Sequence, residues 1–393
     1  MNLIFFDNQA RETLLPLTFT RPIADIRCGI LTIREKWEKY FNITSTSITE
    51  DYLAEKFSLH IENENLLIAG NLFPNKYLIE AIHQLKLDEI LVSENNIIAA
   101  KLSKNETENF SITKQYLKTV NFIGELKFLT KSHQIFSWND VEIKSDFELI
   151  TKGRTSSKLS ATNRVVAAEN IFVEEGAIIE HSILNAANSK MYFAKYSEVM
   201  EGCMIRGSFT LGEHSVLKLG AKIYGATTIG QHSKVGGEVN NCVIFGYSNK
   251  AHDGFMGNSV IGEWCNWGAD TNNSNLKNNY EEVKLWNYQK NSFEKTELQF
   301  CGLIMADHSK CGINTMFNTG TVVGVSANIF GAGFPRNIIA DFSWGGAQGT
   351  TTYQLDKAIE TAKKVYERRG LNFNEMEQNI FATIFDKTQH LRK

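Results

Sequence analysis

The sequence predicts an α/β domain, then a parallel β-helix, then a short helical tail. Strand-like and helix-like segments alternate in the first part, a six-residue period runs through the middle, and helical spacing returns near the end. We therefore expect the α/β domain at residues 1–155, the β-helix at 160–345 and the helices at 353–392.

The α/β domain is indicated by short apolar runs separated by helix-like segments. The runs "NLIFF", "NLLIA" and "EILVS" are apolar and short enough to be buried strands. The segment "ILTIREKWEKYF" carries apolar residues at helical spacing instead. Strands alternating with helices are typical of α/β domains.

The β-helix is indicated by aliphatic residues that recur every six positions. Each hexapeptide of such a repeat forms one side of a coil and sends one side chain inward, so that stacked coils bury an apolar column. The period fits neither a simple helix nor a simple sheet. The recurring residues are Val165, Ile171, Ala177, Ile183, Phe193, Val199, Ile205, Leu211, Leu217, Ile223, Ile229, Val235, Phe255, Ile261, Trp267, Met305, Cys311, Phe317, Val323 and Ile329.

Two breaks in the period mark the place where a site can be built. The first lies between Val235 and Phe255 and exposes the loop that holds His252. The second spans residues 267–300, where a run of Asn, Asp, Ser and Thr cannot fill inward positions and indicates an excursion from the coil. We expect the two breaks to lie within a coil or two of each other on the prism surface.

The tail carries apolar residues at helical spacing. Leu355, Ile359 and Tyr366 mark a first helix that Gly370 ends, and Asn374 caps a second. We expect this tail to cover the end of the prism or to join subunits.

Composition excludes several partner classes. A formal net charge of −3 with dispersed Lys and Arg predicts no nucleic-acid or anionic-membrane partner. The six cysteines form no CxxC pair, which favours reduced thiols over disulfides or a zinc site. The apolar run at the start is too short for a signal peptide, and nothing approaches a membrane span. We expect a cytoplasmic location.

The segment around His252 resembles the acetyltransferase domain of GlmU-type bifunctional sugar-nucleotide synthases. The likeness rests on the order of short motifs: K-A-H, an aromatic with a glycine, V-I-G-E, N-x-G-A-x-T and N-L. The segment "GNSVIGEWCNWGADTNNSNLKNNYEEVKLWN" is most similar to a divergent, Bacteroidetes-type branch. The repeat itself resembles the left-handed, hexapeptide β-helix. That kinship implies a homotrimer with sites between neighbouring prisms.

The resemblance implies transfer of an acetyl group from acetyl-CoA to the amine of glucosamine 1-phosphate. His252 stands at the position of the general base, and an imidazole with a pKa near ~6.5 suits that role. Asn275 matches a residue that contacts the substrate or the developing oxyanion. The substrate-binding candidates are Lys218, Lys250, Phe255, Lys277 and Lys284.

Three departures put the identity of the sugar in question. Phe255 stands where many relatives have tyrosine, Asp270 replaces a glycine, and Glu281 stands where some relatives have a lysine. For the CoA arm, Gly324, Ala327 and Gly331 would leave a narrow groove for pantetheine, although ordinary coil packing explains these small residues equally well.

Residues 10–29, "ARETLLPLTFTRPIADIRCG", resemble the signature of sugar-phosphate nucleotidyltransferases, which have a Rossmann-like α/β fold. The likeness implies UTP or another NTP as substrate, with Arg11, Arg21 and Arg27 facing phosphates. The family's glycine-rich turn is replaced here by "DNQARET", past which backbone amides approach a triphosphate less closely.

The magnesium ligand of that family also differs. Nucleotidyl transfer uses Mg²⁺, held by an aspartate after the third strand, and Asn71 stands there as a weaker ligand that still marks the nucleotide site. Asp7, Asp140 and Asp146 are alternative carboxylates, so the metal ligands stay undetermined.

Three functional interpretations follow. The first is a bifunctional enzyme of UDP-N-acetylglucosamine and cell-wall synthesis, in which the β-helix acetylates an amino-sugar 1-phosphate and the N-terminal domain adds the nucleotide. The second is an acyltransferase whose N-terminal domain binds a sugar nucleotide without catalysis. The third is a non-catalytic trimeric scaffold, because periodicity reports the core and not the chemistry.

Overall fold

A computed structural model describes residues 2–94, 96–114, 116 and 118–392 of the chain. Two compact units make up this part: residues 2–14, 20–26 and 31–131 form the first, and residues 15–19, 27–30 and 132–392 form the second. Each unit is described by itself below.

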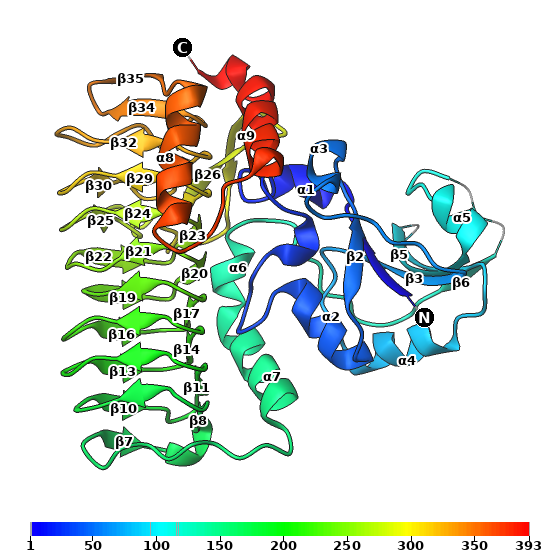
Figure 1. The fold of residues 1–393 in the computed structure, drawn as a ribbon, viewed down its shortest axis with the longest axis horizontal. Coiled ribbons are helices and arrows are strands. Elements are labelled where there is room, and N and C mark those ends of the chain that lie inside the picture. Colours follow the sequence, from blue (N-terminus) through cyan, green and yellow to red (C-terminus); the bar gives the residue numbers. More distant parts are fainter. Residues whose placement is uncertain (1, 95, 115, 117, 393) are drawn as a thin grey trace. The chain divides into compact units, whose positions relative to one another are not determined.

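The first unit is built on a mixed sheet with the strand order β2-β1-β3-β5-β4-β6 (Figure 1). Strand β1 pairs in parallel with β2 and β3, whereas β5 runs antiparallel to both β3 and β4. The strands are β1 (Asn2–Phe6), β2 (Ser45–Ile48), β3 (Glu64–Ala69), β4 (Glu89–Ser93), β5 (Asn96–Ser103) and β6 (Thr119–Asn121). The three strands predicted from apolar runs are β1, β3 and β4, so these predictions are confirmed.

Helices pack beside this sheet. The predicted helix α2 (Ile33–Phe41) begins with a capping box in which the Thr32 side chain accepts from Glu35 N–H and the Glu35 carboxylate accepts from Thr32 N–H. Trp37 on α2 is fully buried and donates from Nε1 to the Leu72 carbonyl at 2.7 Å. The remaining helices are α1 (Ala10–Thr13), η1 (Ile23–Asp25), α3 (Asp51–Ala54), α4 (Lys76–Gln84) and α5 (Lys104–Glu108).

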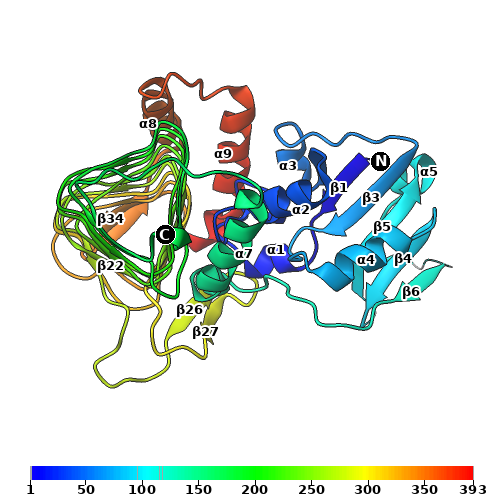
Figure 2. The same cartoon turned by 90° about the horizontal axis from the view of Figure 1, so that it is seen from below.

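The second unit contains the predicted parallel β-helix, which is confirmed. Its coils wind through three sheets in which every coil strand from β7 to β33 pairs in parallel with the next, and seen along the stack they superpose into a three-sided outline (Figure 2). The six-stranded sheet holds β7 (Arg164–Val166), β10 (Ile183–Asn185), β13 (Met204–Arg206), β16 (Lys222–Tyr224), β19 (Glu238–Asn240) and β22 (Phe255–Gly257).

The other two sheets complete the coils. The nine-stranded sheet holds β8 (Ile171–Val173), β11 (Met191–Phe193), β14 (Phe209–Leu211), β17 (Thr227–Ile229), β20 (Val243–Gly246), β23 (Val260–Glu263), β28 (Leu303–Met305), β31 (Thr321–Val323) and β33 (Ile338–Ile339). The ten-stranded sheet holds β9 (Ile178–Ile179), β12 (Glu198–Val199), β15 (Val216–Leu217), β18 (Lys234–Val235), β21 (Asn249–Lys250), β24 (Asn266–Trp267), β29 (Lys310–Cys311), β32 (Asn328–Ile329), β34 (Ser343–Gly346) and β35 (Gly349–Thr352). A short 3-10 turn, η2 (Ala168–Asn170), lies between β7 and β8.

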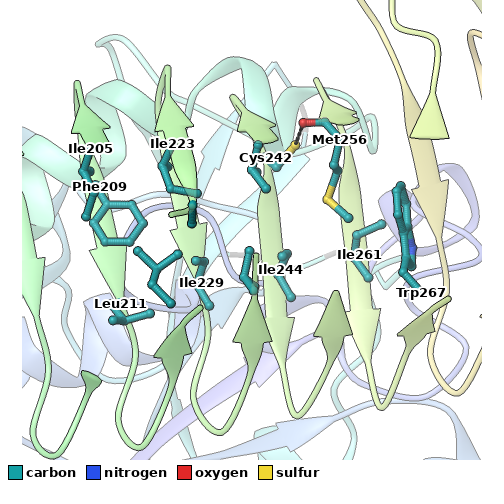
Figure 3. Close-up of a cluster of buried hydrophobic side chains, with 14 of the residues drawn as sticks. Ile205, Phe209, Leu211, Ile223, Ile229, Cys242, Ile244, Met256, Ile261 and Trp267 are labelled. Carbon is teal, nitrogen blue, oxygen red and sulfur yellow. Dashed lines mark hydrogen bonds between the residues drawn. The ribbon is translucent and has the colours of Figure 1, made fainter. Parts of the chain in front are cut away.

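Inward side chains form continuous columns along the stack. Figure 3 shows the labelled side chains of one stretch of this interior, from Ile205 to Trp267. Most residues of the six-residue series are buried there, but the predicted phase is wrong at three places. Leu184, Met256 and Ile179 point inward, where Ile183, Phe255 and Ala177 were expected.

Helices α6 (Gln134–Ser137) and α7 (Asn139–Thr151) belong to the second unit and cover part of the nine-stranded sheet. Asn139 Nδ2 donates to the Ala226 carbonyl at 2.9 Å, and its Oδ1 accepts from Thr228 Oγ1 at 3.0 Å. Phe147 packs edge-on against Phe172. These contacts cover the first coils of the nine-stranded sheet.

A ladder of stacked rings runs along the corner between the nine- and ten-stranded sheets. Each rung has a left-handed φ between 52° and 62°, and successive ring centroids lie 4.3 to 6.2 Å apart. The rungs are Tyr196, His214, His232, Tyr247, Trp264 and His308.

The C-terminal helices pack on the last rungs of this ladder. Tyr366 of α8 (Leu355–Glu367) stacks on Trp264, with the ring centroids 4.0 Å apart. Phe381 of α9 (Glu375–Lys387) packs edge-to-face with His308, with the ring centroids 4.8 Å apart. Asn374 caps α9 as predicted, accepting from Glu377 N–H, and a 3-10 turn, η3 (Gln389–Leu391), follows α9. The tail therefore covers an edge of the prism rather than its end. No helix in the described part of the chain is long and apolar enough to cross a membrane.

Candidate functional site on the face of strand β22

The asparagine-rich stretch continues the coil before it leaves it. Strand β25 (Asn272–Asn273) pairs with β30 (Met316–Phe317) and lies one coil beyond β22. Asn272 Oδ1 accepts from Phe255 N–H at 2.7 Å, and the buried Asn273 amide accepts from Gly257 N–H at 3.0 Å. The predicted excursion was expected to begin at residue 267, but residues 267–275 still belong to the coil. The side-chain amides of Asn272 and Asn273 take the place of the backbone hydrogen bonds between neighbouring strands.

The arm leaves the coil only after Asn275. Leu276 and Phe300 form an isolated antiparallel bridge at its neck, and Cys301 N–H donates to the Asn275 carbonyl at 2.9 Å. Between these points the arm folds into a hairpin of β26 (Lys284–Asn287) and β27 (Ser292–Lys295). We call residues 276–300 the arm.

The arm is tied back to the coils through Tyr288 at its hairpin turn. Tyr288 Oη donates to Asp341 Oδ2 at 3.2 Å, while Val325 N–H donates to Asp341 Oδ1 at 2.6 Å. Asp341 is fully buried, and burial raises its pKa to about 6. The neutral acid is therefore favoured in the folded state at mildly acidic pH.

His252 lies on a corner between β21 and β22 and is exposed to solvent. We call residues 251–254 the His252 corner. Its neighbour in the next coil is Asp270, whose N–H donates to the Asp253 carbonyl at 3.0 Å. His252 is therefore one coil away from the segment that leads into Asn275, and its ring is open to a substrate.

The break in the six-residue period after Val235 includes a shortened corner, which lies one coil before the His252 corner. Val235 ends β18 and Glu238 begins β19, so Gly236 and Gly237 turn the chain alone. A Cβ at Gly236 would lie 2.5 Å from the Ala251 carbonyl oxygen, and one at Gly237 would lie 3.0 Å from the His252 carbonyl oxygen. The two glycines thus let the His252 corner sit directly on the preceding coil.

Phe255 and Asn275 meet over Gly257 on the outer face of β22. A Cβ at Gly257 would lie 2.5 Å from Phe255 Cζ and 2.6 Å from Asn275 Nδ2. Asn275 Nδ2 donates to Asn258 Oδ1 at 2.8 Å, which uses one of its two N–H donors. The structure therefore brings together two of the predicted site residues, Phe255 and Asn275.

Phe255 begins β22 three residues after His252, so this part of the chain spans at most ~10 Å, because an extended residue advances about 3.3 Å. We call this surface, bounded by His252 at one end and by Phe255 with Asn275 at the other, the β22 face.

The predicted lysines occupy different surroundings. Lys218 is half-buried two coils before the His252 corner, with its Cβ 3.1 Å from the position of a Gly236 Cβ. Lys250 is buried, and its Nζ donates to the Gly236 and His252 carbonyls, both at 2.9 Å. Lys218 therefore lies at the edge of the β22 face, whereas Lys250 points into the prism.

The two lysines of the arm lie farther along the chain. Lys277 Nζ donates to the Glu282 carbonyl at 3.0 Å, which closes a local loop. Lys284 is exposed on β26 opposite Lys295. Their roles in substrate binding stay predictions.

Two of the three small residues predicted to line a pantetheine groove pack inside the coils instead. Ala327 is 1% exposed inside the hydrophobic core, so it cannot line an outer groove. A Cβ at Gly324 would lie 2.4 Å from Asp341 N, which means that this glycine serves contact between coils. Gly331 alone of the three is exposed, with φ +103°. For Ala327 and Gly324 the prediction is corrected in favour of coil packing.

The predicted phosphate-binding arginines are buried or hydrogen-bonded to other groups of the protein. Arg11 is 5% exposed, and its guanidinium binds Asp7 Oδ2 at 2.8 Å, the Arg21 carbonyl at 3.1 Å and Tyr52 Oη at 3.0 Å. Arg21 is also buried. Arg27 belongs to the second unit, where it donates to the Ile30 carbonyl and to Gln231 Oε1. Arg11 therefore acts as a structural ion-pair partner in this state.

Asn71 and its neighbours do not make a magnesium site. Asn71 Oδ1 accepts from Asn8 Nδ2 at 2.8 Å, and its Nδ2 donates to the Leu129 carbonyl at 3.1 Å. Asp7 is occupied by Arg11, by Thr49 Oγ1 at 2.6 Å and by Ile23 N–H at 2.8 Å. Burial raises the Asp7 pKa, against the opposing effect of Arg11. Mg²⁺ at phosphate sites is held by one or two carboxylates with waters and substrate phosphates, and the carboxylate here, Asp7, is already bonded to Arg11, Thr49 and Ile23.

The other candidate carboxylates are also committed within the second unit. Asp146 Oδ2 accepts from Ile30 N–H at 2.9 Å, and Asp140 binds Lys144 at 2.7 Å and Ser208 at 2.5 Å. Within the described residues, no group of three His, Cys, Asp or Glu side chains is arranged to hold a metal ion. The residues present do not fit Mg²⁺.

Comparison with known proteins finds similarities in both parts of the chain. Residues 3–155 match the model of the family described as sugar nucleotidyl transferase. The bifunctional protein GlmU of Methanocaldococcus jannaschii is 27% identical over 254 residues, which cover 61% of this chain and 50% of that protein. The matched segment thus spans half the length of that relative.

A solved structure is also similar. It is a hexapeptide transferase family protein from Anaplasma phagocytophilum, with 10% identity and a TM-score of 0.25, and the match covers 57% of this chain and 92% of that one. The parallel β-helix of the present chain is established by its own strand pairing.

Proposed function

We propose that this chain is a transferase that moves an acetyl group from acetyl-CoA to the amine of an amino-sugar 1-phosphate, at the β22 face. The observation that carries the proposal is the exposed imidazole of His252 at one end of a face whose other end holds the Asn275 amide. The likeness of the chain to a GlmU protein supports an amino-sugar phosphate as the acceptor.

His252 removes the proton that blocks the reaction. An ammonium group has no lone pair to attack a thioester, so the imidazole accepts one proton from it. The amine nitrogen then bonds to the thioester carbon to give a tetrahedral intermediate, and this intermediate collapses as the C–S bond breaks. The nitrogen loses its second proton, the imidazolium returns a proton to the CoA thiolate, and one proton in total is released to solvent. Free CoA thiol and an N-acetyl sugar phosphate are the products.

Asn275 offers a hydrogen-bond donor to the bound substrate. Its amide has two N–H donors, and Asn258 occupies one of them. The other donor serves a polar group of the substrate at the Phe255 end of the β22 face. Phe255 beside it offers an apolar surface to the sugar ring instead of a tyrosine hydroxyl.

Lys218 is the proposed partner of the sugar phosphate. It lies on the His252 side of the β22 face, two coils before the His252 corner. A lysine binds phosphate as a point charge, so a phosphate held there places the sugar across the face.

A homotrimer completes the proposal. Three outward side chains in the first coils of the six-stranded sheet are apolar and exposed, namely Val166 at 50%, Ile183 at 44% and Met204 at 46%, whereas the later coils carry polar residues such as Lys222 and Glu238. This apolar patch supports packing against another copy. Light scattering should give three times the chain mass of 44.4 kDa, and a monomer would contradict the trimer.

The experiment that tests the function is release of free thiol from acetyl-CoA. Glucosamine 1-phosphate, galactosamine 1-phosphate and glucosamine 6-phosphate serve as acceptors, and N-acetylglucosamine 1-phosphate is the control because it has no free amine. Thiol release with at least one of the two 1-phosphates and none with the control supports the proposal, whereas release with glucosamine 6-phosphate alone contradicts the assigned acceptor. No release with any acceptor contradicts it and favours the scaffold interpretation.

The first unit has a second candidate function. The family match over residues 3–155 favours nucleotidyl transfer from UTP to an N-acetyl sugar 1-phosphate, whereas the occupied Asn71 and Asp7 weigh against a magnesium-dependent step. We propose that this unit binds a sugar nucleotide. Pyrophosphate release from UTP would establish the catalytic alternative instead.

A further inference from the structure

Lys250 occupies an inward position in an otherwise apolar column. Strand β21 pairs with β18 so that Lys250 lies next to Val235, and its neighbour Asn249 pairs with Asn266 of β24, which places Trp267 on the other side. Lys250 is 4% exposed. The column therefore holds an amine between a valine and a tryptophan, where the pattern of the repeat calls for an aliphatic residue.

This placement costs stability. A buried ammonium loses its hydration, and burial lowers the pKa of Lys250 to about 8. The charged and titratable groups that face it are Asp253, Asp270, Cys242 and Cys311, which oppose that effect. Well-packed apolar residues in place of buried charges are often neutral or stabilising. Folding alone therefore gives no reason for a lysine here.

The lysine amine instead holds one specific corner. Nζ donates at 2.9 Å to the carbonyl of His252 and at 2.9 Å to the carbonyl of Gly236 in the coil below. These bonds reach the His252 corner from inside, while the His252 ring lies outside in solvent. The carbonyl and the side chain share one Cα, so fixing the carbonyl also fixes the direction in which the imidazole leaves the backbone.

The rest of the corner is shaped to accept this bond. Gly254 has φ +118°, and a Cβ there would lie 2.2 Å from the Thr271 carbonyl oxygen of the next coil. A Cβ at Gly237 below would lie 2.8 Å from Asp253 Cα, so a side chain there would displace the corner. The corner is thus enclosed between two coils and is pinned by the lysine at its centre.

We propose that Lys250 is a positioning residue, whose buried amine orients His252 toward the β22 face by holding its backbone carbonyl. This inference rests on the proposed function for its catalytic meaning, but the geometry of the His252 corner can be tested without it. A base must lie about 2.6–3.2 Å from the proton it removes, and a misplacement of 1 Å costs about 10²-fold in rate.

Lys310 offers a control for the bond itself, at a half-buried outward position next to the inward Cys311. It is also an amine within the ten-stranded sheet, its Nζ donates to a histidine carbonyl, that of His308, at 2.8 Å, and burial lowers its pKa to about 8. His308 lies under the C-terminal helices and not on the β22 face. Lys250→Met and Lys310→Met therefore remove the same kind of bond at two places.

The test combines kinetics with NMR of ¹³Cε1-labelled histidine. The His252 resonance is assigned by its absence in a His252→Ala variant. Lys250→Met should shift this resonance and lower kcat by about 10- to 100-fold with little change in KM, while Lys310→Met should change neither. Retained folding of both variants is checked by circular dichroism.

The outcomes separate the two proposals. A His252 resonance and a kcat that both stay unchanged in Lys250→Met would overturn the positioning role, as would equal losses in the two lysine variants. If the wild-type protein released no thiol, the proposed function would fall. A shift of the His252 resonance confined to Lys250→Met would still support the positioning role in that case.

Discussion

The side-chain amide of Asn273 forms two hydrogen bonds with the backbone of Gly257. Its Oδ1 accepts from the Gly257 N–H at 3.0 Å, and its Nδ2 donates to the Gly257 carbonyl at 3.1 Å. A buried side chain thus supplies the pairing that a neighbouring strand normally gives, and it fixes the strand on which Phe255 and Asn275 meet.

Substitution of Asn273 should lower the free energy of unfolding. Asn273→Ala removes both bonds and leaves the buried Gly257 N–H without a partner, while the Gly257 carbonyl keeps its bond from Ser259 Oγ at 2.8 Å. We expect a cost of about 1–3 kcal/mol. Chemical denaturation measures the change. Asn278→Ala, at an exposed position on the arm, is the control and should stay within ~0.5 kcal/mol of the wild type. Equal stability of the two variants would contradict this account of Asn273.

Gly257 should tolerate no side chain without loss of activity. A methyl group there meets Phe255 Cζ and Asn275 Nδ2 at 2.5 and 2.6 Å, so both groups must move. We expect Gly257→Ala to lower kcat for acetyl transfer by about 10- to 100-fold. Gly312→Ala is the matched control, because a Cβ there has its nearest neighbour at 3.4 Å. Unchanged kinetics in Gly257→Ala would show that neither group contacts the substrate.

Asp341 should make stability depend on pH. Burial raises its folded pKa to about 6, above the ordinary value of 3.8. The folded state therefore binds the proton more tightly, and this contribution to stability is full below pH 3.8 and lost as pH rises through 6. Between pH 5 and pH 7.5 the loss is about 1.4 kcal/mol.

An Asp341→Asn variant tests this value, because an amide keeps an acceptor for Val325 N–H but does not titrate. The difference in unfolding free energy between variant and wild type should change by about that amount across the same pH range. A constant difference would mean that the Asp341 carboxyl is not held with a raised pKa.

Mg²⁺ should have no effect on nucleotide binding by the first unit. Asn71 and Asp7 already have protein partners, so no set of oxygen ligands is available for the ion. Calorimetry with UDP-N-acetylglucosamine should give the same Kd in Mg²⁺ and in EDTA. Magnesium-dependent release of pyrophosphate from UTP would contradict this prediction and restore the bifunctional interpretation.

The sequence predicts the fold well because the interior of a coil must be apolar at a regular interval. The phase fails where two adjacent residues are both apolar, as at Ile183 and Leu184 or Phe255 and Met256. Either residue of such a pair satisfies the pattern, and only the strand pairing decides which one points inward.

The candidate site is predicted in part. His252 and the segment leading to Asn275 lie in adjacent coils, as the two breaks in the period suggested. The role of Asn273 escaped prediction because polar residues suggest exposure, and its partner Gly257 is 16 residues away. The signal that would reveal such positions is a polar residue that falls on the six-residue count. Lys250, six residues before Met256, is an example.

His252 is proposed as the base for acetyl transfer. The most direct test is to measure kcat of the His252→Ala variant in the thiol-release reaction with glucosamine 1-phosphate. The ring is exposed, so its removal should leave folding intact. We predict a fall of about 10²- to 10⁴-fold in kcat. Full activity in a folded His252→Ala protein would contradict the claim.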